Sequence, residues 1–142
     1  MDSPFVKESC EFLSEVNSVL KNSPFELAYR ALNELLLSVK CINPKNEIDL
    51  QSVWDDFLMM KVLPRIEGDS EKLDFDGEES LLTNLEAIMR EQLSAIWDGE
   101  KRIDLFRETN EGYVINIECR SKAKISWMQT KLEKFGFTHF WK

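Results

Sequence analysis

Three cysteines and a single histidine are the residues of this sequence that could supply a nucleophile or a zinc ligand. Cys10, Cys41 and Cys119 are widely spaced and form no CxxC pair. A Cys–His nucleophile pair would have to use His139, which lies three residues from the end of the sequence. We therefore expect buried or half-buried free thiols, no metal site and no catalytic residues among them.

Carboxylates are the other abundant reactive groups. Asp55 and Asp56 lie in a predicted helix, where neighbours point about 100° apart, so we do not expect them to share a substrate. Residues 67–80 hold seven carboxylates and one lysine, which predicts a solvated loop with room for a short helical turn. Residues 74–77 faintly resemble a calcium loop but lack its full ligand spacing, so a metal-dependent enzyme is only an alternative here.

Motifs that bind phosphate or activate a nucleophile are missing from the sequence. It has no GxxxxGK[ST] phosphate loop, no GxGxxG, no HExxH and no GxSxG, and it has five glycines in all. We do not expect an independent enzyme.

Helical spacing of apolar residues predicts the elements that must position these groups. Four helices are expected, over residues 4–21, 23–42, 49–63 and 81–96. Ser23 and Glu26 form a capping box around a proline, which predicts the start of the second helix, and its broad apolar stripe predicts that this helix is central. Pro64 is expected to end the third helix.

The spacing of the apolar residues changes after residue 100. Residues 102–106 and 113–117 predict a small β-hairpin near residues 101–118. A last helix follows, and Gly136 is a good residue to terminate it. The sequence therefore predicts a mainly α fold with residues 1–66 as a helical bundle and 67–80 as an acidic loop. Residues 81–142 should form a helix, the hairpin and a C-terminal helix that pack on the bundle.

Composition predicts a folded cytoplasmic domain. The chain has 142 residues, of which 43% are hydrophobic and 31% charged, and no apolar run is long enough for a membrane span. The net charge of -8 argues against a freestanding nucleic-acid binder. The charge is uneven, however, because residues 1–100 hold 9 basic and 21 acidic side chains whereas residues 101–142 hold 9 and 5. This asymmetry indicates either two surfaces with different partners or one subdomain that packs on another.

Four segments, in this order, resemble one protein family. They read FELAYR at residues 25–30, VLPRIEG at 62–68, KISWM at 124–128 and LEKFGFTHFW at 132–141. Together they resemble the C-terminal part of McrB-type restriction NTPases, a branch of the AAA+ class. In that family an F-E-x-x-Y-R helix follows the nucleotide-binding core, a K-V-L-P-R-I-x-G helix end comes next, and a W-M helix with a G-F-T-x-F-W tail closes the chain. No motif of the resemblance falls between residues 67 and 120.

The resemblance implies a helical bundle like an AAA+ lid subdomain, with a C-terminal extension. The Walker A and B motifs that precede this region in the family have no counterpart here, so the resemblance does not imply an active NTPase. It implies no cofactor for this chain, with GTP or ATP bound only by an intact AAA+ core. The expected function is a non-catalytic module that closes over nucleotide in that core and mediates subunit contacts.

The implied partners are an AAA+ core or a neighbouring NTPase subunit, and a restriction nuclease subunit. Direct nucleic-acid binding and membrane binding are not expected. The alternative is a stand-alone adaptor or regulator of a restriction or defence complex, which the charge asymmetry and the aromatic tail favour. A fragment of a longer NTPase and a small separate relative both fit these residues.

Arg30 is the candidate nucleotide-sensing residue. The resemblance implies that it reaches nucleotide phosphates, a task that suits the planar, permanently charged guanidinium. Its alternative role is to form ion pairs on one helix face with Glu26 and Glu34, which lie four residues before and after it. Lys61 and Arg65 are interface candidates, and solvated helix-end charges are their alternative.

Trp127, Phe140 and Trp141 are the remaining interface candidates. Aromatic residues interleaved with lysines can stack on the bases of single-stranded nucleic acid. At helical spacing they more often belong to a core. We expect the aromatic tail to pack on the bundle, and a protein interface or a nucleic-acid site are the alternatives.

Overall fold

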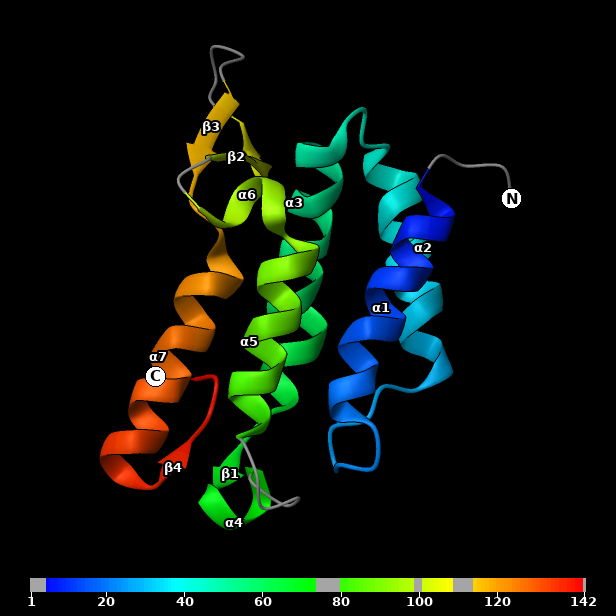
Figure 1. Cartoon of the computed structure of the whole chain (residues 1–142). Helices are drawn as coiled ribbons and strands as arrows, with labels where there is room; N and C mark the ends of the chain where they lie inside the picture. The colour runs from blue at the N-terminus through cyan, green and yellow to red at the C-terminus, as the bar shows by residue number, and fades with distance from the viewer. Residues whose placement is uncertain (1–4, 74–79, 99–100, 109–113, 142) are drawn as a thin grey trace.

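The computed structural model describes residues 5–73, 80–98, 101–108 and 114–141. It is mainly helical and has two small antiparallel strand pairs, which confirms the predicted helical class and the hairpin (Figure 1). Among the helices in these ranges, none is both long and apolar enough to cross a membrane.

The elements follow one another along the chain as seven α-helices, two short helical turns and four strands in the described residues. The α-helices are α1 (Val6–Leu20), α2 (Tyr29–Ile42), α3 (Glu47–Phe57), α4 (Ser70–Leu73), α5 (Leu81–Gln92), α6 (Ser94–Trp97) and α7 (Arg120–Phe135). A π-helical turn η1 (Leu58–Val62) and a 3-10 turn η2 (Leu63–Arg65) follow α3. The strands are β1 (Gly68–Asp69), β2 (Arg102–Glu108), β3 (Val114–Ile117) and β4 (Phe137–Thr138).

The predicted position of the first helix is confirmed by α1. The expected cap at residues 3–4 lies outside the described residues. Phe12, Val16 and Leu20 are buried at four-residue spacing, which gives the helix one apolar face. The helix ends where Asn22 adopts a left-handed conformation with φ of 68°. Asparagine tolerates this conformation better than most residues, so the local sequence explains the break.

The predicted capping box at the start of the second helix is wrong. Ser23 donates its hydroxyl to the carbonyl of Leu20 and accepts from the amide of Phe25, so it serves the turn after α1. Phe25 lies in this turn, residues 26–28 are not helical, and both Phe25 and Leu27 are buried. Ala28 has an extended backbone, and helix α2 starts later than predicted, at Tyr29.

The central helix is α3, and the prediction that the second helix is central is also wrong. Eight consecutive residues of α3 and η1, from position 51 to 58, are buried. In α2 only Leu35 and Val39 are buried, and Leu37 is exposed. Asn46 caps α3 by accepting a hydrogen bond of 2.9 Å from the amide of Asp49. The regular helix ends at Phe57, and η1 and η2 carry the chain past Pro64.

The helices form two layers around one core. Helix α5 packs against α1 on one side and α7 on the other, while α2 and α3 lie behind them (Figure 1). The rings of Phe12 and Trp54 stack between the layers with centroids 4.5 Å apart. The predicted helix over 81–96 is broken at Leu93 into α5 and α6, and Gln51 of α3 accepts from the amide of Ala95 at 2.8 Å.

Two strand pairs attach the remaining segments. Strands β2 and β3 form the predicted antiparallel hairpin. Strands β1 and β4 pair Gly68 with Thr138, a contact between the predicted acidic loop and the tail that the sequence did not indicate. Within that loop β1 and α4 are ordered elements, whereas residues 74–77 lie outside the described residues. Gly136 ends α7 with φ of 71°, as predicted.

Candidate functional site

A buried ionic joint connects α3, β2 and the start of α7. We use the name ionic joint for Asp55, Asp56, Arg102, Asp104 and Arg120. Arg102 has no exposed side-chain surface, and it donates to Asp55 at 2.7 Å and to Asp56 at 2.7 and 2.8 Å. Arg120 donates to Asp56 at 3.1 Å and to Asp104 at 2.9 Å. The joint therefore holds three carboxylates and two guanidiniums against each other.

Asp55 and Asp56, which we do not expect to share a substrate, converge on a side chain of the fold itself. Both accept from Arg102, because a guanidinium has several N–H groups along its edges and can donate to carboxylates from two directions. The guanidinium is a partner within the fold and not a substrate. A signal for such a partner exists in the sequence, since two carboxylates interrupt a helix that is apolar on both sides. The matching arginine lies 46 residues away and could not be assigned from spacing.

Asp55 also caps helix α7 from a distance. Its two carboxylate oxygens accept from the backbone amides of Arg120 and Ser121, each at 2.8 Å. Helix α7 has no side-chain cap of its own at Cys119, so a carboxylate from α3 satisfies the amides that every helix start leaves free. A negative charge at this end also complements the helix dipole.

Electrostatics keep the arginine of the joint charged. Burial acts to lower the pKa of Arg102, but the hydrogen bonds and charges of Asp56 and Asp55 outweigh burial and leave the pKa raised. Buried ion pairs of this kind are stable only when their hydrogen bonds are satisfied, as they are here. The joint is therefore a structural connection in which every one of the five charged side chains has a partner of opposite charge.

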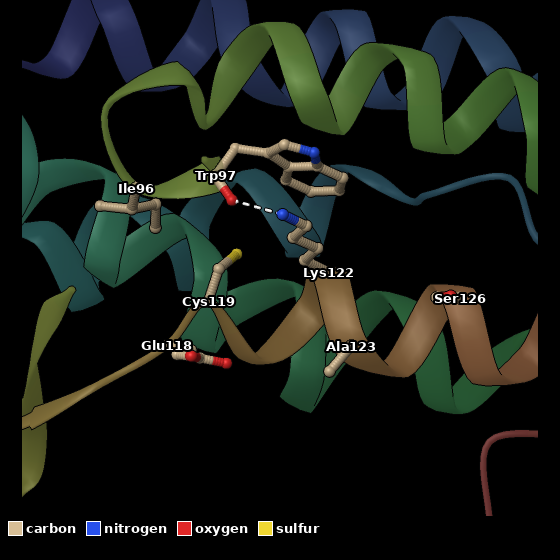
Figure 2. Close-up of a pocket in the computed structure, with 7 residues that line it drawn as sticks. All are labelled: Ile96, Trp97, Glu118, Cys119, Lys122, Ala123 and Ser126. Carbon is tan, nitrogen blue, oxygen red and sulfur yellow. Dashed lines mark hydrogen bonds between the residues drawn. The ribbon is translucent and has the colours of Figure 1, made fainter. Parts of the chain in front are cut away.

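A pocket of about 290 Å³ lies beside the joint, between α6 and the start of α7 (Figure 2). Cys119 lines it, and Lys122 reaches across it to donate to the carbonyl of Trp97 at 2.7 Å. Burial, followed by the charge of Asp55, raises the pKa of the Cys119 thiol to about 12. The thiol of Cys119 is therefore protonated at neutral pH, and the thiol form is a much weaker nucleophile than the thiolate.

His139 does not meet Cys119. The thiol contacts Asp55 at 3.3 Å and Ser121 at 3.6 Å. His139 instead lies 2.8 Å from the amine of Lys131, on the tail. Within the described ranges, no group of three or more His, Cys, Asp or Glu side chains could hold a metal ion.

Arg30 lies in the first turn of α2 and is exposed. Ala28 precedes the helix and provides no side-chain cap, and the first turn contains no acidic residue. Tyr29 beside it is 80% exposed, at the edge of a groove of about 250 Å³ between α1 and α2. The helix therefore begins without a side-chain cap and with an exposed arginine.

The alternative ion pairs for Arg30 do not form. Glu26 precedes α2 in the non-helical segment, so it does not lie on the same helix face. Glu34 pairs with Lys61 at 3.4 Å. Among the described residues Arg30 has no ion-pair partner. Lys61 and Arg65 are both exposed, in η1 and η2, and Lys61 links these turns to α2.

The C-terminal aromatic residues divide into buried and exposed members. Phe140 is buried, and its carbonyl accepts from Lys124 at 3.0 Å, so this part of the tail packs on α7. Trp127 is half-buried with the amines of Lys124 and Lys131 at 4.6 and 5.1 Å from its ring. Trp141 is 64% exposed and free to meet a partner.

Comparison with known sequences identifies the family. The chain belongs to the family described as "Domain of unknown function (DUF8727)", whose sequence profile matches residues 2–137. No curated protein and no solved structure matches the chain. The family description assigns no activity, so function is argued from the residues described above.

Proposed function

We propose that this chain is a non-catalytic helical module that closes over nucleotide held by a phosphate-loop NTPase core. The observation that carries the proposal is the exposed, unpaired Arg30 at the uncapped start of α2. The motif segments that resemble McrB-type restriction NTPases, FELAYR among them, support the same role. GTP or ATP would then be bound by the core and contacted by this chain.

The start of α2 has the chemistry of a phosphate contact. Free amides at a helix start attract anions, and the helix dipole adds to the attraction. An arginine at this end is unfavourable for the helix itself by roughly 0.3–1 kcal/mol, so helix stability does not explain its position. A phosphate oxygen would satisfy both the amides and the guanidinium.

The ionic joint supports a module that moves as one body. It ties α3 to the hairpin and to the start of α7, and α3 in turn packs against α2, which carries Arg30. A nucleotide contact at Arg30 would therefore be transmitted to the surfaces of η1, η2 and α7. Lys61 and Arg65 on η1 and η2 are then candidate contacts to a neighbouring subunit.

The proposal is tested by first searching the genes that adjoin this one for a phosphate-loop NTPase and then purifying that NTPase. We expect the purified chain to raise the GTP or ATP hydrolysis rate of that NTPase, and we expect Arg30→Ala to lose at least about tenfold of the increase. Arg90→Ala, a change at another exposed arginine, on α5, separates loss of the nucleotide contact from loss of surface charge. Absence of an adjoining phosphate-loop gene, or equal stimulation by Arg30→Ala, would contradict the proposal.

A second candidate function is a protein-binding adaptor of a restriction or defence complex. The exposed aromatic side chains at the C-terminal end favour it, namely Phe135, Phe137 and Trp141. Large exposed aromatic side chains that lie close together are typical of protein interfaces. An adaptor would need these residues and would not need Arg30, so the two candidates differ in which variant loses function.

A further inference from the structure

One surface of the protein alternates aromatic rings with lysines. We define the aromatic–lysine surface as Trp127, Lys131, Lys134, Phe137, His139 and Trp141. The amine of Lys131 lies 5.1 Å from the ring centre of Trp127 and 2.8 Å from His139, whose ring centre lies 5.7 Å from that of Phe137. These contacts join four of the residues across α7 and the tail, Lys134 follows Trp127 and Lys131 at helical spacing, and the ring of Trp141 lies 4.8 Å from that of Phe140 in the same tail. Phe137 and Trp141 are 44% and 64% exposed, which leaves apolar area uncovered.

The side chain of Lys131 is already positioned by its contacts within the free protein. An ammonium close to an aromatic ring is attracted by the ring and loses part of its rotational freedom. Binding of a partner carboxylate would therefore cost the lysine side chain less conformational entropy. The patch is suited to an acidic protein surface that also offers apolar contact.

A second surface has the opposite charge. We define the glutamate groove as Glu8, Glu11, Glu15, Glu47 and Glu91, which surround a groove of about 410 Å³ with buried Trp54 and Gln51 in its wall. Glu8, Glu11 and Glu15 come from one face of α1, and the other two come from α3 and α5. Across the described residues none of the five forms an ion pair. Their mutual repulsion would fall if cations entered the groove.

The two surfaces cannot satisfy each other within one chain. The glutamate groove lies between α1, α5 and the start of α3, while the aromatic–lysine surface lies on α7 and the tail. Helices α1 and α7 are on opposite flanks of α5 (Figure 1). Complementary surfaces on opposite flanks can pair only between molecules.

We propose that the partner of the aromatic–lysine surface is the glutamate groove of a second copy of this chain. Because the two surfaces differ, the contact is heterologous, and it repeats from copy to copy in a head-to-tail arrangement. Opposite charges bring the copies together, and the exposed rings of Phe137 and Trp141 supply the apolar area. The contact does not involve Arg30, so it stands or falls independently of the proposed nucleotide role.

Sedimentation velocity of the full chain tests the contact. We expect a mean mass that rises with concentration up to about 200 µM at low salt, and that falls at about 0.5 M salt as charge attraction is screened. The double variants Glu11→Lys/Glu15→Lys and Lys131→Glu/Lys134→Glu should each remain monomeric. Mixed one to one, they should associate again, because the intact surface of each variant matches the intact surface of the other and their two reversed surfaces are also opposite in charge.

Two controls match the charge changes on exposed residues elsewhere. Lys40→Glu/Lys45→Glu and Glu26→Lys/Glu67→Lys alter net charge equally and should associate like the wild type. Circular dichroism checks that every variant is folded, and Trp141→Ala, at an exposed site, replaces a lysine variant that does not fold.

Three results would overturn the inference. The first is a wild-type chain that stays monomeric at low salt, and the second is unchanged association of both charge-reversed variants. The third is a monomeric wild type that binds a single-stranded thymidine oligonucleotide through Lys131 and Lys134, which would assign the patch to nucleic acid.

Discussion

Asp55 accepts hydrogen bonds at 2.8 Å from the amide of Ser121, 66 positions further along the chain. The start of one helix therefore depends on a carboxylate in the middle of another. Asp55 is fully buried, and it also binds the guanidinium of Arg102. This residue is the point where α3, the hairpin and α7 are held together.

Replacing Asp55 should cost a large part of the stability of the fold. Asp55→Asn keeps the shape but removes the charge, and its amide would direct a donor at groups that are themselves donors. Removing one partner of a buried pair typically costs about 3–5 kcal/mol, and we expect a loss in that range. Urea unfolding followed by tryptophan fluorescence measures the loss.

The matched control is an exposed ion pair on α5. Glu86 and Arg90 lie 2.8 Å apart on the surface, and Glu86→Gln should change the unfolding free energy by less than about 0.5 kcal/mol. If Asp55→Asn cost no more than Glu86→Gln, the ionic joint would not be the connection described here.

Cys119 should make the stability depend on alkaline pH. Its thiol ionises near pH 9 in the unfolded chain, whereas burial holds the pKa at about 12 in the folded protein. The unfolded state then binds fewer protons between these values, so the unfolding free energy falls by roughly 1.4 kcal/mol per pH unit above pH 9. Cys119→Ser lacks this ionisation and keeps a hydroxyl that can donate to Asp55. Parallel pH profiles for the wild type and Cys119→Ser, measured by urea unfolding between about pH 8 and pH 10, would be inconsistent with a buried protonated thiol.

The two aromatic residues at the end of the tail should behave differently. Phe140 is buried and Trp141 is exposed, although they are neighbours in sequence. We expect Phe140→Ala to lower the unfolding free energy by about 3 kcal/mol, and Trp141→Ala to change it by less than about 0.5 kcal/mol. Equal losses in urea unfolding would show that the tail packs in another way.

The sequence could predict the elements whose signal is local. Helical spacing identified α1, α3, α5 and α7, and strand spacing identified the hairpin, because each pattern lies within one segment. Gly136 was identifiable for the same reason, since a left-handed residue at a helix end favours glycine. The capping box predicted at Ser23 was wrong because the same residue types also serve turns, and Ser23 here bonds the turn that follows α1.

The ionic joint could not be predicted, because its partners are far apart. The sequence near Cys119 does not indicate that Asp55 caps α7. The sequence near Arg102 does not indicate that its side chain, on strand β2, binds a carboxylate of α3. Strands β1 and β4 are two residues long and join segments about 70 positions apart, which is too short for a strand pattern. Arg30, in contrast, could be predicted as a candidate from its motif. Only the structure shows that it is exposed and that it has no ion-pair partner among the described residues.

The most direct measurement of the central claim is a titration of the isotope-labelled chain with inorganic triphosphate, followed by amide NMR. We expect the amides of Tyr29, Arg30 and Ala31 to shift, with weak binding at about 1–10 mM because the chain has no phosphate loop of its own. Arg30→Ala should lose these shifts and Arg65→Ala should keep them. Shifts confined to other parts of the chain, or the same shifts in Arg30→Ala, would contradict a phosphate contact at the start of α2.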